Sequence, residues 1–268
     1  MPLAIPDGYA REYGGSGEPL VLVGEILAGA AAWRPHAEAL AERWRVTVTS
    51  PLLTIYAGRG EWPPGPWSIA GEADLLAAYL DEAGLGRVHL GGWSLGGGIA
   101  MELAMAQPER VRSLTLVEPQ VWWVMRGLHN EPPEYIGVME RYRRFVVDDV
   151  DEDTLAEFLW EVGGTPRDQD PRKHRGWRLA YTNRAAISYA WTIINTGQDI
   201  GRVARLHMPV LLSRGDRARP FDVAMTDGLA GLIPHAERFV LPGAHTSHIE
   251  NAGAFVVRLT AFLETASA

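Results

Sequence analysis

Residues 88–98 read Val-His-Leu-Gly-Gly-Trp-Ser-Leu-Gly-Gly-Gly, and this stretch decides how the chain folds. Its first residues are apolar and suit a short buried strand, whereas residues 99–104, which follow it, are good helix formers. Ser94 therefore lies on a sharp turn between a strand and a helix, and its glycine neighbours tolerate a strained backbone there. The N–H groups that begin the helix favour negative charge beside the hydroxyl. The pattern predicts a functional serine rather than an idle serine in a glycine-rich turn.

The segments around this turn alternate between strands and helices. Apolar or β-branched runs predict strands at 20–23, 45–49, 88–91, 111–117, 208–213 and 238–241. Helical patterns cover 35–43, 68–82, 221–232 and 252–264, and a loop rich in proline and glycine is expected over 50–66. This alternation predicts an α/β fold, with a mostly parallel central sheet and helices on both of its faces.

The alternation breaks in the middle of the chain. Between 121 and 196 the patterns predict helices near 134–147, 153–162 and 177–194, and no convincing strand. We therefore expect a core formed by residues 1–120 and 197–268, and an all-helical cap formed by 121–196.

Composition narrows the class of protein further. The chain has 268 residues, 47% of them hydrophobic, which suits one α/β domain that carries an insertion. The net charge of -8 comes from scattered acidic residues, which argues against a nucleic-acid partner. The absence of cysteine excludes disulfides and thiolate metal sites. Residues 1–8 lack the pattern of a signal peptide, and no apolar run approaches the roughly 20 residues of a membrane helix. We expect a cytoplasmic monomer or homodimer that does not bind membranes.

A serine hydroxyl becomes a nucleophile only when a base takes its proton and a third group orients that base. His245 ends the small-residue turn Leu-Pro-Gly-Ala-His, directly after the last predicted strand, and is the expected base. His248 could replace it, but we expect His248 to pack or to cap a helix. Two carboxylates follow predicted strands, Glu118 after 111–117 and Asp216 after 208–213, and either could reach the imidazole from the carboxyl edge of the sheet.

Together, the turn over residues 92–96 and the loop over 241–251 resemble the nucleophile elbow and the histidine loop of the α/β-hydrolase superfamily. The resemblance covers the chain from about Glu18 to Leu263. It implies that Ser94 attacks a carbonyl and that the backbone N–H groups of Leu95 and Ile26 hold the resulting oxyanion. It implies no metal and no organic cofactor.

The sequence departs from the family pattern at the acid. Members usually carry an aspartate in a Gly-x-x-Asp pattern after the strand that corresponds to 208–213, and here Ala218 occupies that position. Some members place the acid at the end of the preceding strand instead, which is the position of Glu118. We therefore expect Glu118 to be the acid, with Asp216 as the alternative.

A second departure follows the first strand, where the family usually has His-Gly and this chain has Gly24-Glu25. An ionised Glu25 aimed into the site would repel an oxyanion. Either Glu25 points away, for example toward an arginine, or it takes part in the chemistry as an acid or base.

Aromatic and apolar residues near these segments suggest the substrate. Trp122 and Trp123 come directly after Glu118, where the chain enters the cap. Tryptophan offers a large apolar surface with a single donor. The residues expected to line an apolar substrate pocket are Trp93, Trp122, Trp123, Leu27 and Tyr56.

The leading hypothesis is a serine hydrolase that cleaves a carboxylic ester of an apolar or aromatic small molecule through an acyl-enzyme on Ser94. The alternative is a non-hydrolytic or C–C bond-cleaving enzyme of the same fold, a lyase or cyclase, that moves protons with His245 and Glu25. A third class is a ligand-binding protein with a disabled site, but an intact serine, histidine and acid argue against it.

Overall fold

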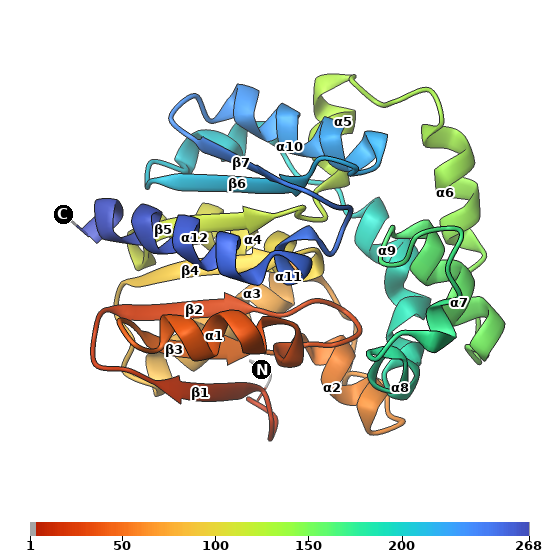
Figure 1. Cartoon of the computed structure of the whole chain (residues 1–268), viewed down its shortest axis with the longest axis horizontal. Coiled ribbons are helices and arrows are strands. Elements are labelled where there is room, and N and C mark those ends of the chain that lie inside the picture. The colour runs from red at the N-terminus through yellow and green to blue at the C-terminus, as the bar shows by residue number, and fades with distance from the viewer. Residues whose placement is uncertain (1–3, 268) are drawn as a thin grey trace.

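The computed structural model describes residues 4–267. Residues 1–3, which begin the segment where no leader is expected, lie outside the described residues. Within 4–267, seven strands form one sheet in the order β1-β3-β2-β4-β5-β6-β7 (Figure 1). The strands are β1 (Ala10–Gly14), β2 (Pro19–Val23), β3 (Arg45–Thr49), β4 (Val88–Trp93), β5 (Val111–Val117), β6 (Val210–Gly215) and β7 (Glu237–Leu241).

All neighbouring pairs from β3 to β7 are parallel, and only β1 runs antiparallel, against β3 at the edge of the sheet. The mostly parallel α/β architecture expected from the sequence is therefore confirmed. The sequence patterns did not predict β1, because this strand is largely exposed and has no apolar run.

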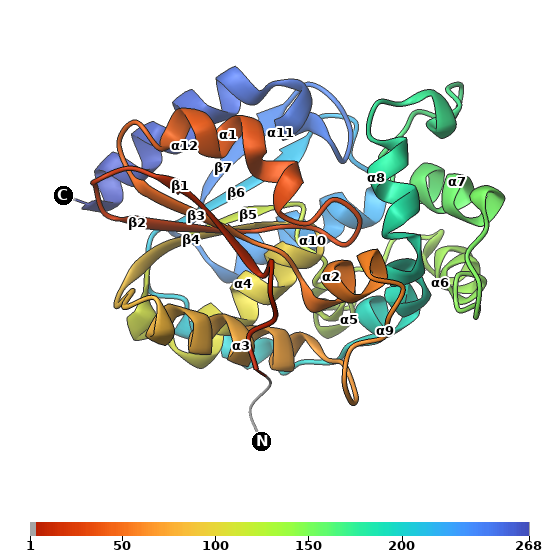
Figure 2. The same cartoon turned by 90° about the horizontal axis from the view of Figure 1, so that it is seen from below.

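Helices cover both faces of the sheet (Figure 2). Helices α1 and α12 pack together on one face, where their apolar residues meet Leu22, Val48 and Val117. Helices α3, α4 and α10 cover the other face over Val21, Leu90 and Leu212. The α-helices of the core are α1 (Arg34–Leu40), α2 (Leu52–Gly58), α3 (Ile69–Glu82), α4 (Leu95–Ala106), α10 (Pro220–Leu232), α11 (Ser247–Glu250) and α12 (Ala252–Ser267).

The segment between β5 and β6 is helical and lies beyond the carboxyl ends of the parallel strands (Figure 1). Its α-helices are α5 (Trp122–Leu128), α6 (Tyr135–Arg143), α7 (Glu152–Glu161), α8 (Trp177–Thr182) and α9 (Ala190–Asn195). Short 3-10 helices complete the chain at Ala30–Trp33, Pro108–Arg110, Pro171–Lys173, Arg184–Tyr189 and Ile200–Arg205.

Two local expectations were wrong. The expected helix over 177–194 is broken at Asn183, whose side-chain N–H donates to the carbonyl of Leu27 at 2.6 Å and ties the cap to the core. The expected loop over 50–66 contains α2, because Leu52 and Leu53 are buried and the carbonyl of Pro51, the N-cap residue, accepts the N–H groups of Thr54 and Ile55. None of the helices within residues 4–267 is both long and apolar enough to cross a bilayer.

Candidate active site

Ser94 occupies a strained turn between β4 and α4. Its φ of 55° is rare for a residue with a side chain, and it places the residue at the N-cap of α4. Two glycines make the turn possible. A Cβ on Gly92 would lie 2.2 Å from the carbonyl oxygen of Gly96, and a Cβ on Gly96 would lie 2.3 Å from that of Val23. The backbone therefore needs the glycines on both sides of the serine.

Backbone hydrogen bonds fix this turn to the neighbouring strand. The N–H of Ser94 donates to the carbonyl of Val117 at 3.0 Å, and the N–H of Gln120 donates to the carbonyl of Ser94 at 3.0 Å. The end of β5 and the turn thus hold each other in place.

Glu118 and His245 form a buried pair at the carboxyl edge of the sheet. His245 Nδ1 lies 2.7 Å from Glu118 Oε2, and both side chains are almost completely buried. The second carboxylate oxygen, Oε1, accepts the N–H of Gly215 at 2.8 Å. Burial acts to raise the pKa of Glu118, but His245 and this N–H outweigh it and hold the pKa below its usual value. Glu118 is therefore ionised at neutral pH and can orient the imidazole.

Asp216 does not reach the imidazole. Its side chain is exposed, and its Oδ1 accepts the N–H of Gly243 at 2.8 Å, two residues before His245. Asp216 thus supports the backbone of the histidine loop, whereas Glu118 contacts the ring itself. Of the two carboxylates that the sequence analysis left as alternatives, only Glu118 is hydrogen-bonded to the imidazole within the described residues.

Glu25 folds back onto its own loop. Its carboxylate accepts the N–H of Leu27 at 2.8 Å and also the N–H of Ala28, and the side chain is buried. The arginine partner suggested as one possibility is not present among the ion pairs of residues 4–267. Burial raises the pKa of Glu25, against the opposite effect of the two N–H donors. Glu25 therefore shapes the loop that carries Ile26.

Ser94 and His245 line the same small cavity, of about 30 Å³, between the sheet edge and the cap. No hydrogen bond joins the Ser94 hydroxyl to the His245 ring among the described residues. Ile26 and Leu95 line the same space, and the N–H of Leu95 is the first of α4, where the helix offers no acceptor. The remaining lining residues are mostly apolar: Gln120, Tyr142, Phe158, Val162, Ala190, Ile193 and Ile194.

The five residues expected to line a substrate pocket do not line this small cavity: Trp93 packs against His245, and the other four pack in or against the hydrophobic core. Trp93 contacts the rings of His245 and His248 and donates its indole N–H to the carbonyl of His245 at 3.1 Å. Trp122 stacks on Phe221 of α10. The other three pack in or against the hydrophobic core: Trp123, Leu27 and Tyr56.

His248 packs, as expected. It is completely buried, stacks on His36 and has Trp93 at its edge, with ring centroids 4.6 Å apart. Burial lowers its pKa well below the usual value, so it stays neutral. His248 packs against Trp93, and Trp93 in turn packs against the ring of His245.

Comparison with known proteins identifies the family to which the chain belongs. A family model described as alpha/beta hydrolase fold matches residues 18–252. The chain belongs to the α/β-hydrolase fold family. This confirms the resemblance drawn from the serine turn and the histidine loop.

Several curated proteins are similar to this α/β-hydrolase-fold chain. A putative carbamate hydrolase of Azorhizobium caulinodans is 45% identical over 40% of this chain, and the match spans 39% of that protein. A putative carbamate hydrolase of Pseudomonas syringae is 28% identical over 80% of this chain and 83% of its own length. A pimeloyl-[acyl-carrier protein] methyl ester esterase of Aeromonas hydrophila is 39% identical over 61% of each chain. The chain thus spans about two-fifths of the length of the first of these relatives.

Solved structures support the fold over the whole length. A hydrolase from Pseudomonas aeruginosa superposes with a TM-score of 0.78 at 23% identity, over 95% of this chain and 93% of that one. A thermophilic esterase from Thermogutta terrifontis gives a TM-score of 0.74 at 21% identity, over 97% and 93%. At this identity the likeness concerns the fold alone.

The structure also shows a buried acid that the sequence analysis missed. Asp222 on α10 is completely buried, and ligand atoms of Asp222, Glu118 and His245 all lie within 4.8 Å of one another. Arg219 holds Oδ2 of Asp222 with two hydrogen bonds of 2.8 and 3.0 Å. Burial raises the pKa of Asp222, although Arg219 opposes this. No sequence motif marks Asp222, because Arg219, three residues earlier, lies just before the predicted helix 221–232.

Three such groups could in principle hold a metal ion. Here, however, Glu118 and His245 are already bonded to each other, and the Asp222 carboxylate carries a guanidinium that would repel a second cation. The arrangement fits an ion-pair network behind the histidine better than a metal centre.

Proposed function

We propose that this chain is a serine hydrolase that cleaves a carboxylic ester of a small, apolar acyl group through an acyl-enzyme on Ser94. The observation that carries the proposal is the Glu118–His245 pair beside a strained serine in one shared cavity. Relatives named as a carbamate hydrolase, a lipase and a methyl ester esterase support hydrolysis of a carbonyl substrate.

Each residue has one task in the reaction. Ser94 Oγ attacks the carbonyl carbon while His245 Nε2 takes the hydroxyl proton, and Glu118 stabilises the imidazolium that forms. The N–H groups of Ile26 and Leu95 hold the oxyanion, a contribution of about 3 kcal/mol for each such donor. His245 then gives the proton to the leaving alcohol. Water attacks the acyl-enzyme by the same route, releasing the acid and restoring the serine.

The lining of the cavity indicates the acyl group. Phe158, Ile193 and Ile194 are buried and apolar, and they face the serine from the cap. A volume of about 30 Å³, enough for about two water molecules, means that the side chains must move further for a long acyl chain than for a short one. We therefore expect acetyl and butyryl esters to react faster than long-chain esters.

Burst kinetics test this proposal. p-Nitrophenyl acetate and butyrate should give a rapid release of p-nitrophenol followed by a slower steady rate, because acylation by such an activated ester is faster than deacylation. Ser94→Ala should lose both phases and should no longer be labelled by a fluorophosphonate. Ser16→Ala, which changes an exposed serine between β1 and β2, serves as the matched control. Normal ester turnover by Ser94→Ala would refute the proposal.

A carbamate is the second acyl chemistry to test, because relatives from several bacteria are named putative carbamate hydrolases. The same serine would attack the carbamate carbonyl. Steady turnover of a p-nitrophenyl carbamate, faster than that of the matched ester, would favour this function over ester cleavage.

A further inference from the structure

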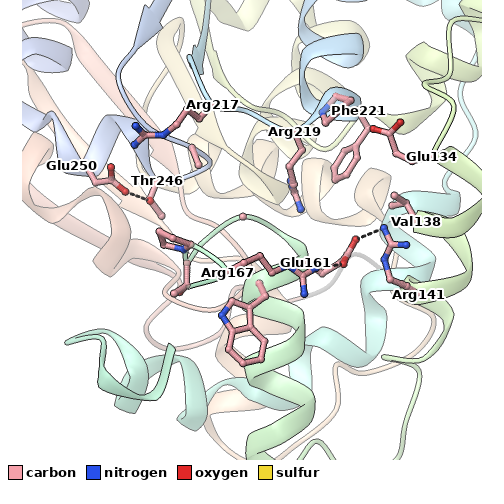
Figure 3. A pocket seen from close by; sticks show the side chains of 16 residues that line it. Glu134, Val138, Arg141, Glu161, Arg167, Arg217, Arg219, Phe221, Thr246 and Glu250 are labelled. Atoms are coloured by element: carbon pink, nitrogen blue, oxygen red, sulfur yellow. Dashed lines mark hydrogen bonds and ion pairs between the residues drawn. The ribbon is translucent and has the colours of Figure 1, made fainter. Parts of the chain in front are cut away.

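A second and larger cavity lies beside the catalytic histidine. It has a volume of about 470 Å³ and is bounded on one side by α6, α7 and the loop that follows α7 (Figure 3). The loop before α10 and the histidine loop form the other side. Ala244 and Thr246 line this cavity, whereas His245 between them lines the cavity of Ser94. The two cavities therefore share a wall.

The charged part of this second cavity contains both arginines and glutamates. The wall contains four arginines and three glutamates, one more cation than anion: Arg141, Arg167, Arg217, Arg219, Glu134, Glu161 and Glu250. Glu161 is buried and pairs with both Arg141 and Arg167 at 2.9 Å. Asp222 lies behind the wall and balances Arg219. Arg217 is exposed and forms no ion pair within residues 4–267.

Two guanidinium groups in this wall hold buried N–H donors that have no acceptor among the described residues. Arg219 uses Nε and Nη2 on Asp222, and its Nη1 forms no hydrogen bond of normal geometry within residues 4–267, although the buried Tyr142 hydroxyl lies beside the guanidinium. Arg141 uses Nη2 on Glu161, and its Nε is left without a partner. Figure 3 shows Arg219 reaching from its loop into the space above Glu161, with Arg141 beside that carboxylate. Buried charged donors without acceptors are costly, so a bound acceptor would stabilise both.

We propose that this cavity binds the carboxylate group of a small organic acid or acid ester. A carboxylate suits single free guanidinium donors because each of its two oxygens can accept one charge-assisted hydrogen bond. A dianionic phosphate fits less well, because three glutamates in the same wall would repel its second charge. Trp160, which is half-buried, and Pro166, which is exposed, offer apolar surface for the carbon chain that carries the carboxylate.

The carboxylate has two possible sources. It is either the far end of the substrate, reaching from Ser94 past the shared wall, or a free acid that occupies the cavity by itself. The first of these rests on the proposed function, whereas binding of an acid to the cavity does not depend on catalysis.

A binding experiment tests the site itself. Glutarate is titrated calorimetrically into the Ser94→Ala protein, which cannot turn over an ester. We expect saturable binding that Arg141→Gln and Arg217→Gln each weaken by about tenfold or more, the loss of one charge-assisted hydrogen bond. Glu161 keeps Arg167 in the first variant, and Arg217 is exposed, so both variants should fold. Arg144→Gln, an exposed arginine at the end of α6, is the matched control.

Saturable binding that is equal in all of these proteins, or no binding up to about 10 mM glutarate, overturns the proposal. Because the titration uses a protein without the serine, its failure is distinct from a failure of the proposed hydrolysis.

A kinetic experiment then separates the two sources. The wild type is compared on mono-p-nitrophenyl glutarate and on its methyl-capped, neutral counterpart. If the substrate carries the carboxylate, the charged ester has the higher kcat/KM, and Arg141→Gln removes the preference. If a free acid is the ligand, the two esters react alike and added glutarate changes both rates equally. Either pattern agrees with the site, and a preference that survives Arg141→Gln and Arg217→Gln contradicts it.

Discussion

Replacing Glu118 by glutamine should remove most of the activity without disturbing the fold. The amide keeps an oxygen for the N–H of Gly215, which Glu118 binds at 2.8 Å. Its NH2 group, however, faces His245 Nδ1 and selects the tautomer that has its proton on Nε2, which cannot accept the proton of Ser94. The variant also loses the negative charge that stabilises the imidazolium.

The structure sets the size of this effect. Two unit charges 2.7 Å apart, at the effective dielectric constant of about 20 that describes protein sites, attract by about 6 kcal/mol. At 1.36 kcal/mol for each factor of ten, this corresponds to a fall in kcat/KM of about four orders of magnitude. The assay is p-nitrophenyl butyrate hydrolysis, with circular dichroism and a thermal melt to verify the fold.

Asp216→Asn is the matched control for this prediction. Asparagine keeps the oxygen that accepts the N–H of Gly243, and the residue does not contact the imidazole, so activity should change less than about threefold. A Glu118→Gln protein that retains a tenth of its activity, or an Asp216→Asn protein that loses most of it, would refute this account of the acid.

Three further predictions concern other parts of the molecule. Burial raises the pKa of Glu72 from 4.5 to about 7, so the folded state binds more protons than the unfolded state and the free energy of unfolding falls as pH rises between these values. Glu72→Gln should therefore be more stable than the wild type by about 3 kcal/mol at pH 8 but not at pH 4, as measured by urea titration. Ile193→Ala should enlarge the small cavity and raise kcat/KM for a hexanoyl ester relative to an acetyl ester by about tenfold, and an unchanged chain-length profile would count against the assigned acyl pocket. Glu25→Gln cannot accept both loop N–H groups, so ester cleavage should fall by about tenfold as the oxyanion loop loosens. Unchanged cleavage by that variant would show that the loop does not need the carboxylate.

Much of the fold could be predicted because buried parallel strands leave a strong local signal. The strands at Arg45–Thr49 and Val111–Val117 occur exactly where the apolar and β-branched runs predict them. The strained turn at Ser94 and the small-residue loop that holds His245 were also predictable, because each depends on the small residues adjacent to it in the sequence. The edge strand β1 has neither kind of signal.

The rest of the site depends on contacts across the chain. Glu118 and Asp216 both follow strands, and local sequence cannot say which side chain lies against a histidine more than a hundred residues from the first of them. The contacts of the tryptophans could not be predicted from the sequence for a similar reason. Trp122 lies close to Glu118 in the sequence, but its ring stacks on Phe221, which is on a helix far later in the chain. Asp222 carries no motif, and only the packing of α10 reveals it.

The hydrogen bond from the Gln120 N–H to the Ser94 carbonyl limits how the helical segment between β5 and β6 could be exchanged for another one. Val117 and Gln120 are hydrogen-bonded to the backbone of Ser94, and α5 packs on α10 through Trp122 and Phe221. Replacing every residue after β5 would remove the hydrogen bond that holds the Ser94 turn, together with the helices that cover the small cavity. The junction for a chimera should lie after Leu128, where α5 ends and the chain leaves the core.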